Sequence, residues 1–355
     1  MKFLSISIFI LISLIFVRYF STRPVYENGD NIRITSRVYS EPIIYDRQQY
    51  LKLQGLKMYL PKYPEVIYGD RVQVTGKVEN GKLVNPKLEK LETEDKNILF
   101  NLRLKLISFY KASLPEPYSS LVAGITIGSK NMPENFWERL KKTGTAHVVV
   151  ASGTNVTMTA SFLIAVLTYF FKRRLAIWIT LVGILGYVVI SGFDAPIIRA
   201  GIMGSILLLG QEKGRLVNSW RLLIYSAGIM LLIKPIWITD LGFILSFVAT
   251  MSLMLFQKRI DSKLKFVPNI LREGLSTSLA AQIGVAPIIY ATFGQFNILS
   301  PIINALILWT VPYIMIFGAI GGIVGLVVPL VGRLILFILF PLLLWFTKVL
   351  EIFSF

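Results

Sequence analysis

A histidine, a serine and an asparagine lie close together in an apolar stretch of the sequence, where they could donate, accept or transfer protons. The histidine, His147, is the only one in the chain. The small and polar residues that follow it are Ser152, Gly153, Asn155 and Thr159. At about 100° per residue, Ser152, Asn155 and Thr159 share one face of a helix. Polar groups at membrane depth are costly unless they face protein or water. This face therefore predicts the wall of a hydrated pathway, with hydrogen bonding between packed helices as the alternative.

Nucleophilic catalysis by Ser152 with His147 is a further alternative. Their spacing does not place the two side chains on the same face of a helix, and the sequence offers no identifiable oxyanion hole. The chain has no cysteine, which excludes disulfides and thiolate chemistry. A single histidine excludes histidine-cluster metal sites, and no Walker motif is present. We therefore predict no enzyme activity and no cofactor or metal.

A lone arginine begins an apolar segment that otherwise lacks charge. A buried arginine there costs about 2.5–3.5 kcal/mol on insertion scales. Arg199 therefore either reaches the membrane surface or faces an acid or a polyanion. Asp194 and Asp240 are its candidate partners, although Asp240 is equally explained as a helix N-cap. The other candidate pathway residues in apolar surroundings are Ser246, Gln282 and Asn304.

Membrane helices are the elements expected to position these residues. The 355-residue chain is 54% hydrophobic, with a mean hydropathy of +0.63, whereas soluble domains are about 45–50% apolar. The fourth candidate span is short and could be re-entrant. The seventh is too long for one simple span, and we expect it to break at its glycines. The eight candidate spans, with a margin of two, are 147–171, 175–192, 196–211, 220–233, 241–256, 275–292, 301–332 and 334–354.

Basic residues follow every second span. They cluster at 172–174, 213–221 and 258–272, whereas the intervening loops are nearly uncharged. The positive-inside rule places the basic loops in the cytoplasm, so the N-terminal domain and the C-terminus are expected outside. Much of the net charge of +17 is therefore explained by topology. A polyanionic partner is the second interpretation of this charge.

Four regions follow from the distribution of apolar and polar residues. Residues 1–20 predict an uncleaved transmembrane helix, and residues 21–96 alternate like short strands separated by turns. Five or so strands in this length predict a small barrel of the OB type outside the membrane. Residues 97–116 predict an amphipathic helix at the membrane surface, and residues 117–355 a transmembrane domain. The fold class is a polytopic α-helical membrane protein with a small N-terminal OB-type β-barrel domain.

Aromatic residues of the predicted barrel could stack on bases, because OB barrels often bind single-stranded nucleic acid through basic grooves and aromatic platforms. The other interpretation is that they are ordinary strand residues, since aromatic side chains are enriched in strands. The tyrosines concerned are Tyr39, Tyr45, Tyr50, Tyr59, Tyr63 and Tyr68.

Five sequence blocks resemble the ComEC family of competence proteins, in the right order. They are LPEPYSSLVAGITIGSK, FWERLKKTGTAHVVVASGTNV, FDAPIIRAGIMG, KPIWITDLGFILSFVAT and AAQIGVAPIIYATFGQFNILSPIINAL. The resemblance implies a channel that passes single-stranded DNA across the cytoplasmic (inner) membrane during natural transformation. The family features carry over onto His147, Ser152, Gly153, Arg199, Ala200, Asp240, Gly242, Phe243, Ser246, Phe247, Gln282, Pro287 and Asn304.

The chain also departs from the family pattern. Asn155 replaces a second histidine, and Ser129 stands where an acid is usual. Many members continue into a metallo-β-lactamase-like domain, whereas this sequence reaches Phe355 without one. The resemblance therefore implies a separate nuclease, with a DNA receptor outside and a cytoplasmic helicase or ATPase as further partners. Transport of another polyanion or a metabolite on the same fold is the alternative function.

Overall fold

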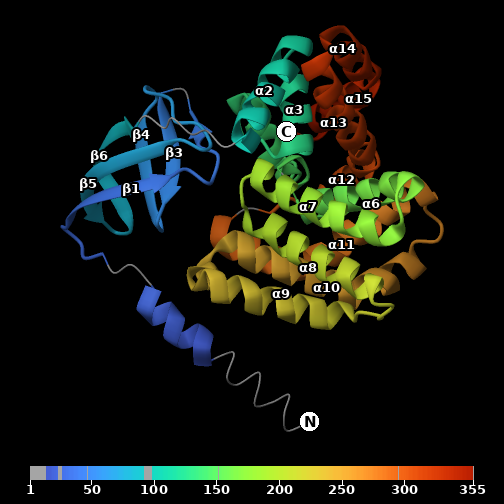
Figure 1. The fold of residues 1–355 in the computed structure, drawn as a ribbon, viewed down its shortest axis with the longest axis horizontal. Helices are drawn as coiled ribbons and strands as arrows, with labels where there is room; N and C mark the ends of the chain where they lie inside the picture. The colour runs from blue at the N-terminus through green and yellow to red at the C-terminus, as the bar shows by residue number, and fades with distance from the viewer. Residues whose placement is uncertain are drawn as a thin grey trace.

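The computed structural model describes residues 13–22, 26–45, 47–91, 98–150, 152–294 and 296–354. A β-sheet part precedes a larger helical part, and the two lie side by side (Figure 1). Residues 13–22 are helical, as expected for the first segment, whereas its residues 1–12 lie outside the described part of the chain.

Alternating apolar and polar residues build the sheet. In β4, Leu56, Met58 and Leu60 are buried, whereas Lys57 and Tyr59 between them are exposed, because successive side chains point to opposite faces of a strand. The apolar faces enclose a core of their own. The strands are β1 (Asn31–Arg37), β2 (Ile43–Ile44), β3 (Gln48–Leu53), β4 (Leu56–Pro61), β5 (Arg71–Glu79) and β6 (Lys82–Leu91).

The expected barrel is not shown, because the sheet is open. Its strand order is β1-β5-β6-β4-β3-β2, and the two edge strands, β1 and β2, do not pair with each other among the described residues. All neighbours are antiparallel except β4 and β6, whose parallel pairing covers only Lys57↔Lys82 and Met58↔Leu83. The alternation of residues predicted a sheet here, although the run 51–60 divides into β3 and β4. Barrel closure depends on pairing between distant strands.

The helical part begins at residue 98. Its elements are α2 (Ile98–Ser113), α3 (Tyr118–Ile127), α4 (Glu134–Lys142), α5 (Ala146–Val149), α6 (Gly153–Phe170), α7 (Arg173–Ser191), α8 (Ala195–Glu212), α9 (Ser219–Ile233), the 3₁₀ helix η1 (Pro235–Thr239), α10 (Leu241–Lys263), α11 (Asn269–Phe293), α12 (Ser300–Leu308), α13 (Val311–Val327), α14 (Pro329–Ile338) and α15 (Phe340–Phe353). The apolar helix α3 is buried from Ser119 to Ile127. It is therefore enclosed by the rest of the helical part.

Helix α2 lies within the segment 97–116 where a helix was expected and ends at Ser113; residue 97 lies outside the described residues. Its position at a membrane surface stays a prediction. In the structure, α2 packs against α3, α7 and α13, and Arg103, Leu106 and Tyr110 on it are buried. The helix is therefore part of the packed helical core.

Four helical segments among the described residues are long and apolar enough to cross a membrane, or up to six if each bent pair is one span. The four are 146–170, α7, α10 and α11, and the bent pairs are α12 with α13 and α14 with α15. The expected eight spans, with their margin of two, agree only with the upper value. Helices α8 and α9 account for the difference. Helix α9 has 15 residues, about 22 Å, and the hydrocarbon core is about 30 Å thick.

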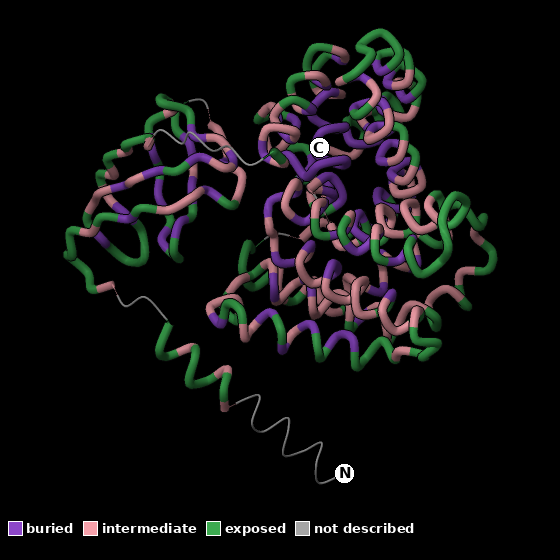
Figure 2. Tube along the Cα trace, viewed as in Figure 1, coloured by how far each residue is buried: buried purple, intermediate pink, exposed green. Residues whose placement is uncertain are grey.

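Apolar side chains on the outer surface support a lipid environment. Leu330, Leu334, Phe337 and Ile338 of α14 are all more than half exposed. Figure 2 shows buried residues gathering where the helices meet, with exposed residues on the outer turns. Monomeric soluble proteins rarely carry large continuous apolar patches. The structure therefore has the helices and the surface of a multi-pass membrane protein.

The seventh expected span does break, but not at its glycines. The chain bends by 46° between α12 and α13, at Trp309 and Thr310. Gly321, Gly322 and Gly325 lie inside α13 and are buried. They allow close packing, because an added Cβ would lie 2.3 Å from Tyr110 Oη at Gly322 and 2.1 Å from Phe109 Cζ at Gly325. The glycines are there for contact between helices, as is common in membrane helices.

We expect Gly332→Ala to lower the thermal stability of the protein in detergent. A Cβ at Gly332 in α14 would lie 2.3 Å from the Cα of Gly325 in α13, and backbone cannot move aside as a flexible side chain can. Overpacking of this kind costs about 1–3 kcal/mol. Gly186→Ala in α7 is the matched control, because a Cβ there meets no atom within 4 Å. Equal unfolding temperatures for the two variants would contradict this packing.

Candidate functional site

The predicted polar face is present at the start of α6. Ser152 occupies the N-cap position, and its Oγ donates to Asn155 Oδ1 at 3.0 Å. Asn155 is buried, and its Nδ2 donates to the main-chain oxygen of Ile125 in α3 at 2.9 Å. Thr159 Oγ1 donates to the main-chain oxygen of Asn155 at 2.9 Å. One of these bonds joins α6 to α3, and the others lie within the start of α6. They correspond to the alternative interpretation, in which the polar residues form hydrogen bonds within a helix bundle.

Arg199 lies directly against this helix start. An added Cβ on Gly153 would lie 2.8 Å from Arg199 Nη2, so a larger residue there would require the guanidinium to shift. The Nε of Arg199 is buried and has no hydrogen-bond partner among the described residues. Its guanidinium carbon lies 5.8 Å from the centre of the Phe247 ring in α10. Arg199 is therefore held between α6 and α10 by packing and an aromatic contact.

Both acids expected to pair with Arg199 bind lysines instead. Asp194 Oδ2 lies 2.7 Å from Lys130 Nζ. Asp240 Oδ2 lies 3.1 Å from Lys52 Nζ on β3, and Asp240 Oδ1 accepts from the main-chain N–H of Phe243 at 3.2 Å. The N-cap interpretation of Asp240 is confirmed. No ion pair of Arg199 occurs within the described ranges.

His147 and Ser152 have different hydrogen-bond partners. Its Nδ1 is 3.0 Å from the main-chain oxygen of Gly144, one turn earlier in the chain. The Ser152 hydroxyl donates to Asn155 and not to the imidazole. Among the described residues, no group of three or more His, Asp or Glu side chains could hold a metal ion.

Two of the remaining candidate residues, Gln282 and Asn304, lie between α11 and α12. Gln282 Nε2 donates to Ser300 Oγ at 2.8 Å, and Asn304 Nδ2 donates to Ser278 Oγ at 2.7 Å. Ser246 lies on α10, and its main-chain oxygen accepts from Thr250. Gln282 and Asn304 therefore join α11 to α12, whereas the Ser246 bond lies within α10. They have no hydrogen bond to Ser152, Asn155 or Arg199 in the part of the chain that the structure describes.

A buried ionic site at the junction of the sheet and the helices was missed. Glu41, between β1 and β2, accepts from Arg103 Nη2 at 2.8 Å and from Ser129 Oγ at 2.9 Å. Arg103 is 1% exposed, and its guanidinium carbon lies 5.1 Å from the centre of the Tyr68 ring. Tyr68 Oη donates to the main-chain oxygen of Val189 at 2.6 Å. Burial raises the pKa of Tyr68. The sequence feature that could have indicated this site is Arg103, a charged residue within the apolar segment of α2.

The predicted base-stacking tyrosines therefore divide into two sets. Tyr68 is buried at this junction, and Tyr39 packs edge-on against Phe193 at 5.8 Å between ring centres. Tyr59 and Tyr63 are exposed, and Tyr59 lies 5.3 Å from Tyr50. Tyr39 is also exposed, so of these residues only Tyr68 is closed to a ligand.

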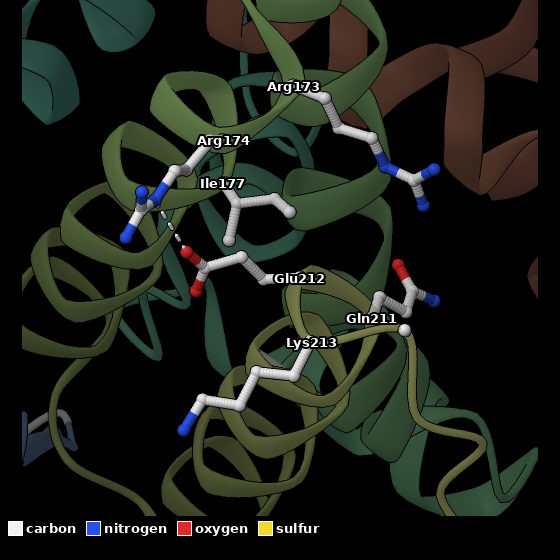
Figure 3. A pocket seen from close by; sticks show the side chains of 7 residues that line it. Arg173, Arg174, Ile177, Gln211, Glu212 and Lys213 are labelled. Atoms are coloured by element: carbon white, nitrogen blue, oxygen red, sulfur yellow. Dashed lines mark hydrogen bonds and ion pairs between the residues drawn. The ribbon is translucent and has the colours of Figure 1, made fainter.

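A polar pocket lies at the other end of α7, between its first turn and the end of α8 (Figure 3). Its volume is about 570 Å³. Arg174 Nε donates to Glu212 Oε1 at 2.9 Å. Arg173 and Gln211 point to the same side, away from that pair (Figure 3). The lining residues are Arg173, Arg174, Ile177, Gln211, Glu212, Lys213 and Gly214.

The sequence of the helical part matches a known protein family. A family model described as "Competence protein" matches residues 125–355, which is more than half of the chain. The chain belongs to the competence protein family. The match includes α6, Arg199 and all the other predicted pathway residues, and it begins after the sheet, Glu41 and Arg103.

One curated relative in this family is ComE operon protein 3 of Bacillus subtilis (strain 168). It is 28% identical over 227 residues, which cover 63% of this chain and 29% of that protein. The chain thus spans less than a third of the length of this relative. No solved structure gives a significant match.

Proposed function

We propose that this competence-family protein provides a route for single-stranded DNA across the cytoplasmic membrane during DNA uptake. The observation that carries the proposal is Arg199 against Gly153. A cation beside the positive N-terminal end of a helix is unfavourable by itself. An anion between them would be stabilised both by the guanidinium and by the N–H groups at the start of α6. A DNA phosphate is such an anion.

The surroundings of Arg199 support this role. Its two candidate counter-ions are already paired, Asp194 with Lys130 and Asp240 with Lys52. Its Nε has no hydrogen-bond partner in the part of the chain that the structure describes. A phosphate passing α6 would supply the missing acceptor, and charge-assisted hydrogen bonds of this kind are about twice as strong as neutral ones.

The orientation of α7 supports a sheet outside the membrane. The last turn of α7 contacts the sheet through Tyr68 and Val189, and its first turn carries Arg173 and Arg174. Since α7 is long and apolar enough to cross a bilayer, the sheet and these arginines would lie on opposite sides. The positive-inside rule assigns the arginines to the cytoplasm.

We propose that the sheet receives the incoming strand outside. Its exposed tyrosines, Tyr59 and Tyr63, offer stacking faces, and its exposed lysines Lys57 and Lys82 offer positive charge to the phosphates of a single strand. More specifically, we propose that the sheet binds a single strand as OB domains do, by base stacking and backbone contacts. Energy, receptor binding and removal of the second strand would come from separate partners, namely a helicase or ATPase, a DNA receptor and a nuclease. We propose a channel and not an enzyme.

The test is to measure the uptake of labelled DNA into the cytoplasm of cells of the organism that encodes this protein, with and without the protein. We expect label in the cytoplasm to disappear in the deletion and to return when the gene is restored. Uptake that continues unchanged without the protein would remove the DNA assignment. Transport of another polyanion or a metabolite on the same fold would then be the function to test.

A further inference from the structure

A chain of buried contacts leads from the sheet to the start of α6. It begins at Glu41, whose carboxylate accepts from Arg103 Nη2 at 2.8 Å, from Ser129 Oγ at 2.9 Å and from the main-chain N–H of Lys130. Glu41 is 11% exposed, so its charge is largely removed from water. A buried carboxylate needs such donors, because an unpaired buried charge is strongly unfavourable. The loop between β1 and β2 is thereby fixed to the helical part.

Arg103 continues the chain by capping two helices. Its Nη1 donates to the main-chain oxygens of Ile127 and Ile190, and its Nη2 lies 3.4 Å from the oxygen of Gly128. These oxygens belong to the C-terminal ends of α3 and α7, whose last carbonyls have no partner within their helices. Gly128 and Gly192 end the two helices with positive φ values of 70° and 102°. The arginine therefore binds the negative ends of both helix dipoles.

The last turn of α3 is also the anchor of α6. The main-chain oxygen of Ile125 accepts from Asn155 Nδ2 at 2.9 Å, two residues before the oxygen of Ile127 that Arg103 binds. Asn155 in turn accepts from Ser152 at the N-cap of α6. Arg103 and Asn155 thus hold one turn of α3 from two sides.

We propose that Glu41 and Arg103 are positioning residues, which set the position of the α6 start through the last turn of α3. The sheet would then help to position the site at the start of α6, in addition to binding the incoming strand. The inference deepens the proposed function, because Gly153 and Arg199 form the candidate phosphate site at this helix start. A loss of the Glu41 charge would loosen α3 and let the first turn of α6 move.

The sheet has a second ion pair to the helices, which offers a matched control. Lys52 on β3 pairs with Asp240 at the start of α10, and both side chains are substantially exposed. This pair ends on α10 and has no hydrogen bond to α3 among the described residues. Lys52→Gln therefore weakens docking of the sheet without disturbing the Glu41 to Asn155 route.

The experiment is cysteine labelling of the purified full chain in detergent. The chain has no native cysteine, so a Thr154→Cys change gives one thiol in the first turn of α6, at an exposed position. Thr168→Cys gives a reference thiol near the end of the same helix, also exposed. We expect Glu41→Gln to change the maleimide reaction rate at position 154 on the order of tenfold. The rate at position 168 should stay the same, and Lys52→Gln should alter neither.

Asn155→Ala supplies an independent check. It should change the rate at position 154 as Glu41→Gln does, and the two changes together should add little, because they break the same route. A wild-type rate at position 154 in Glu41→Gln overturns the proposal. Equal changes at positions 154 and 168, or the same effect from Lys52→Gln, also overturn it. The readout contains no DNA, so its failure is separate from a failure of the DNA proposal.

Discussion

Arg199→Ala is expected to reduce the entry of labelled DNA into the cytoplasm at least about tenfold at equal protein level. The substitution removes the guanidinium that packs against Gly153 and leaves the helix N-terminus as the only positive group of the proposed phosphate site. A hydrogen bond to a charged group contributes about 1.5–3 kcal/mol, and about 1.4 kcal/mol corresponds to a tenfold change. The measurement is the fraction of label that becomes resistant to external nuclease.

Two further variants make this test specific. Arg215→Ala is the control, because Arg215 is an exposed arginine in the loop after α8; uptake should stay at the wild-type level. Gly153→Ala should lower uptake although it removes no charge, because the added Cβ would lie 2.8 Å from Arg199 Nη2 and displace it. If Arg199→Ala takes up DNA as the wild type does, Arg199 is not on the route, whatever the deletion strain shows.

Arg103→Ala is expected to lower the free energy of unfolding by about 3–5 kcal/mol, the cost of removing one partner of a buried ion pair. The change leaves the Glu41 carboxylate without its cation, and it frees the carbonyl oxygens at the ends of α3 and α7. The measurement is the unfolding temperature in detergent. Arg174→Ala is the control, because the Arg174 side chain of the pair with Glu212 is 83% exposed, and exposed pairs contribute about 0–1 kcal/mol.

A double variant separates charge from packing in this result. Glu41→Leu with Arg103→Met removes both charges and keeps apolar volume, and such replacements are often close to neutral. We expect the double variant to unfold at a higher temperature than Arg103→Ala. If it is no more stable, the carbonyl oxygens of the two helix ends, and not the unpaired carboxylate, account for the loss.

Local patterns predicted the parts of this structure that depend on near neighbours. Alternation located the strands, and Asp240 caps α10 as an aspartate before an apolar helix should. Helical spacing placed Ser152, Asn155 and Thr159 together. In each case the deciding contacts lie within a few residues along the chain.

Contacts between distant segments could not be predicted in the same way. The closure of the sheet, the partner of Arg103 and the partner of Asn155 all depend on which segments meet in space. Glu41 lies 62 residues before Arg103, and Asn155 binds a main-chain oxygen of α3, which any residue type could supply. The expected pairing of Arg199 with an acid failed for this reason, because Lys52 and Lys130 reach Asp240 and Asp194 first.

The acceptors of Arg103 also set an order of assembly during synthesis. Glu41 is made before Arg103, Ile127 soon after it, and Ile190 only when α7 is complete. Until then the arginine has part of its donors unmatched, and contacts so far apart in sequence form late. The sheet and the first helices can therefore reach their final arrangement only after the chain has been extended through residue 190. A nascent chain that stalls before this point would carry a folded sheet on an unfinished support, which is the kind of intermediate that quality-control proteases remove.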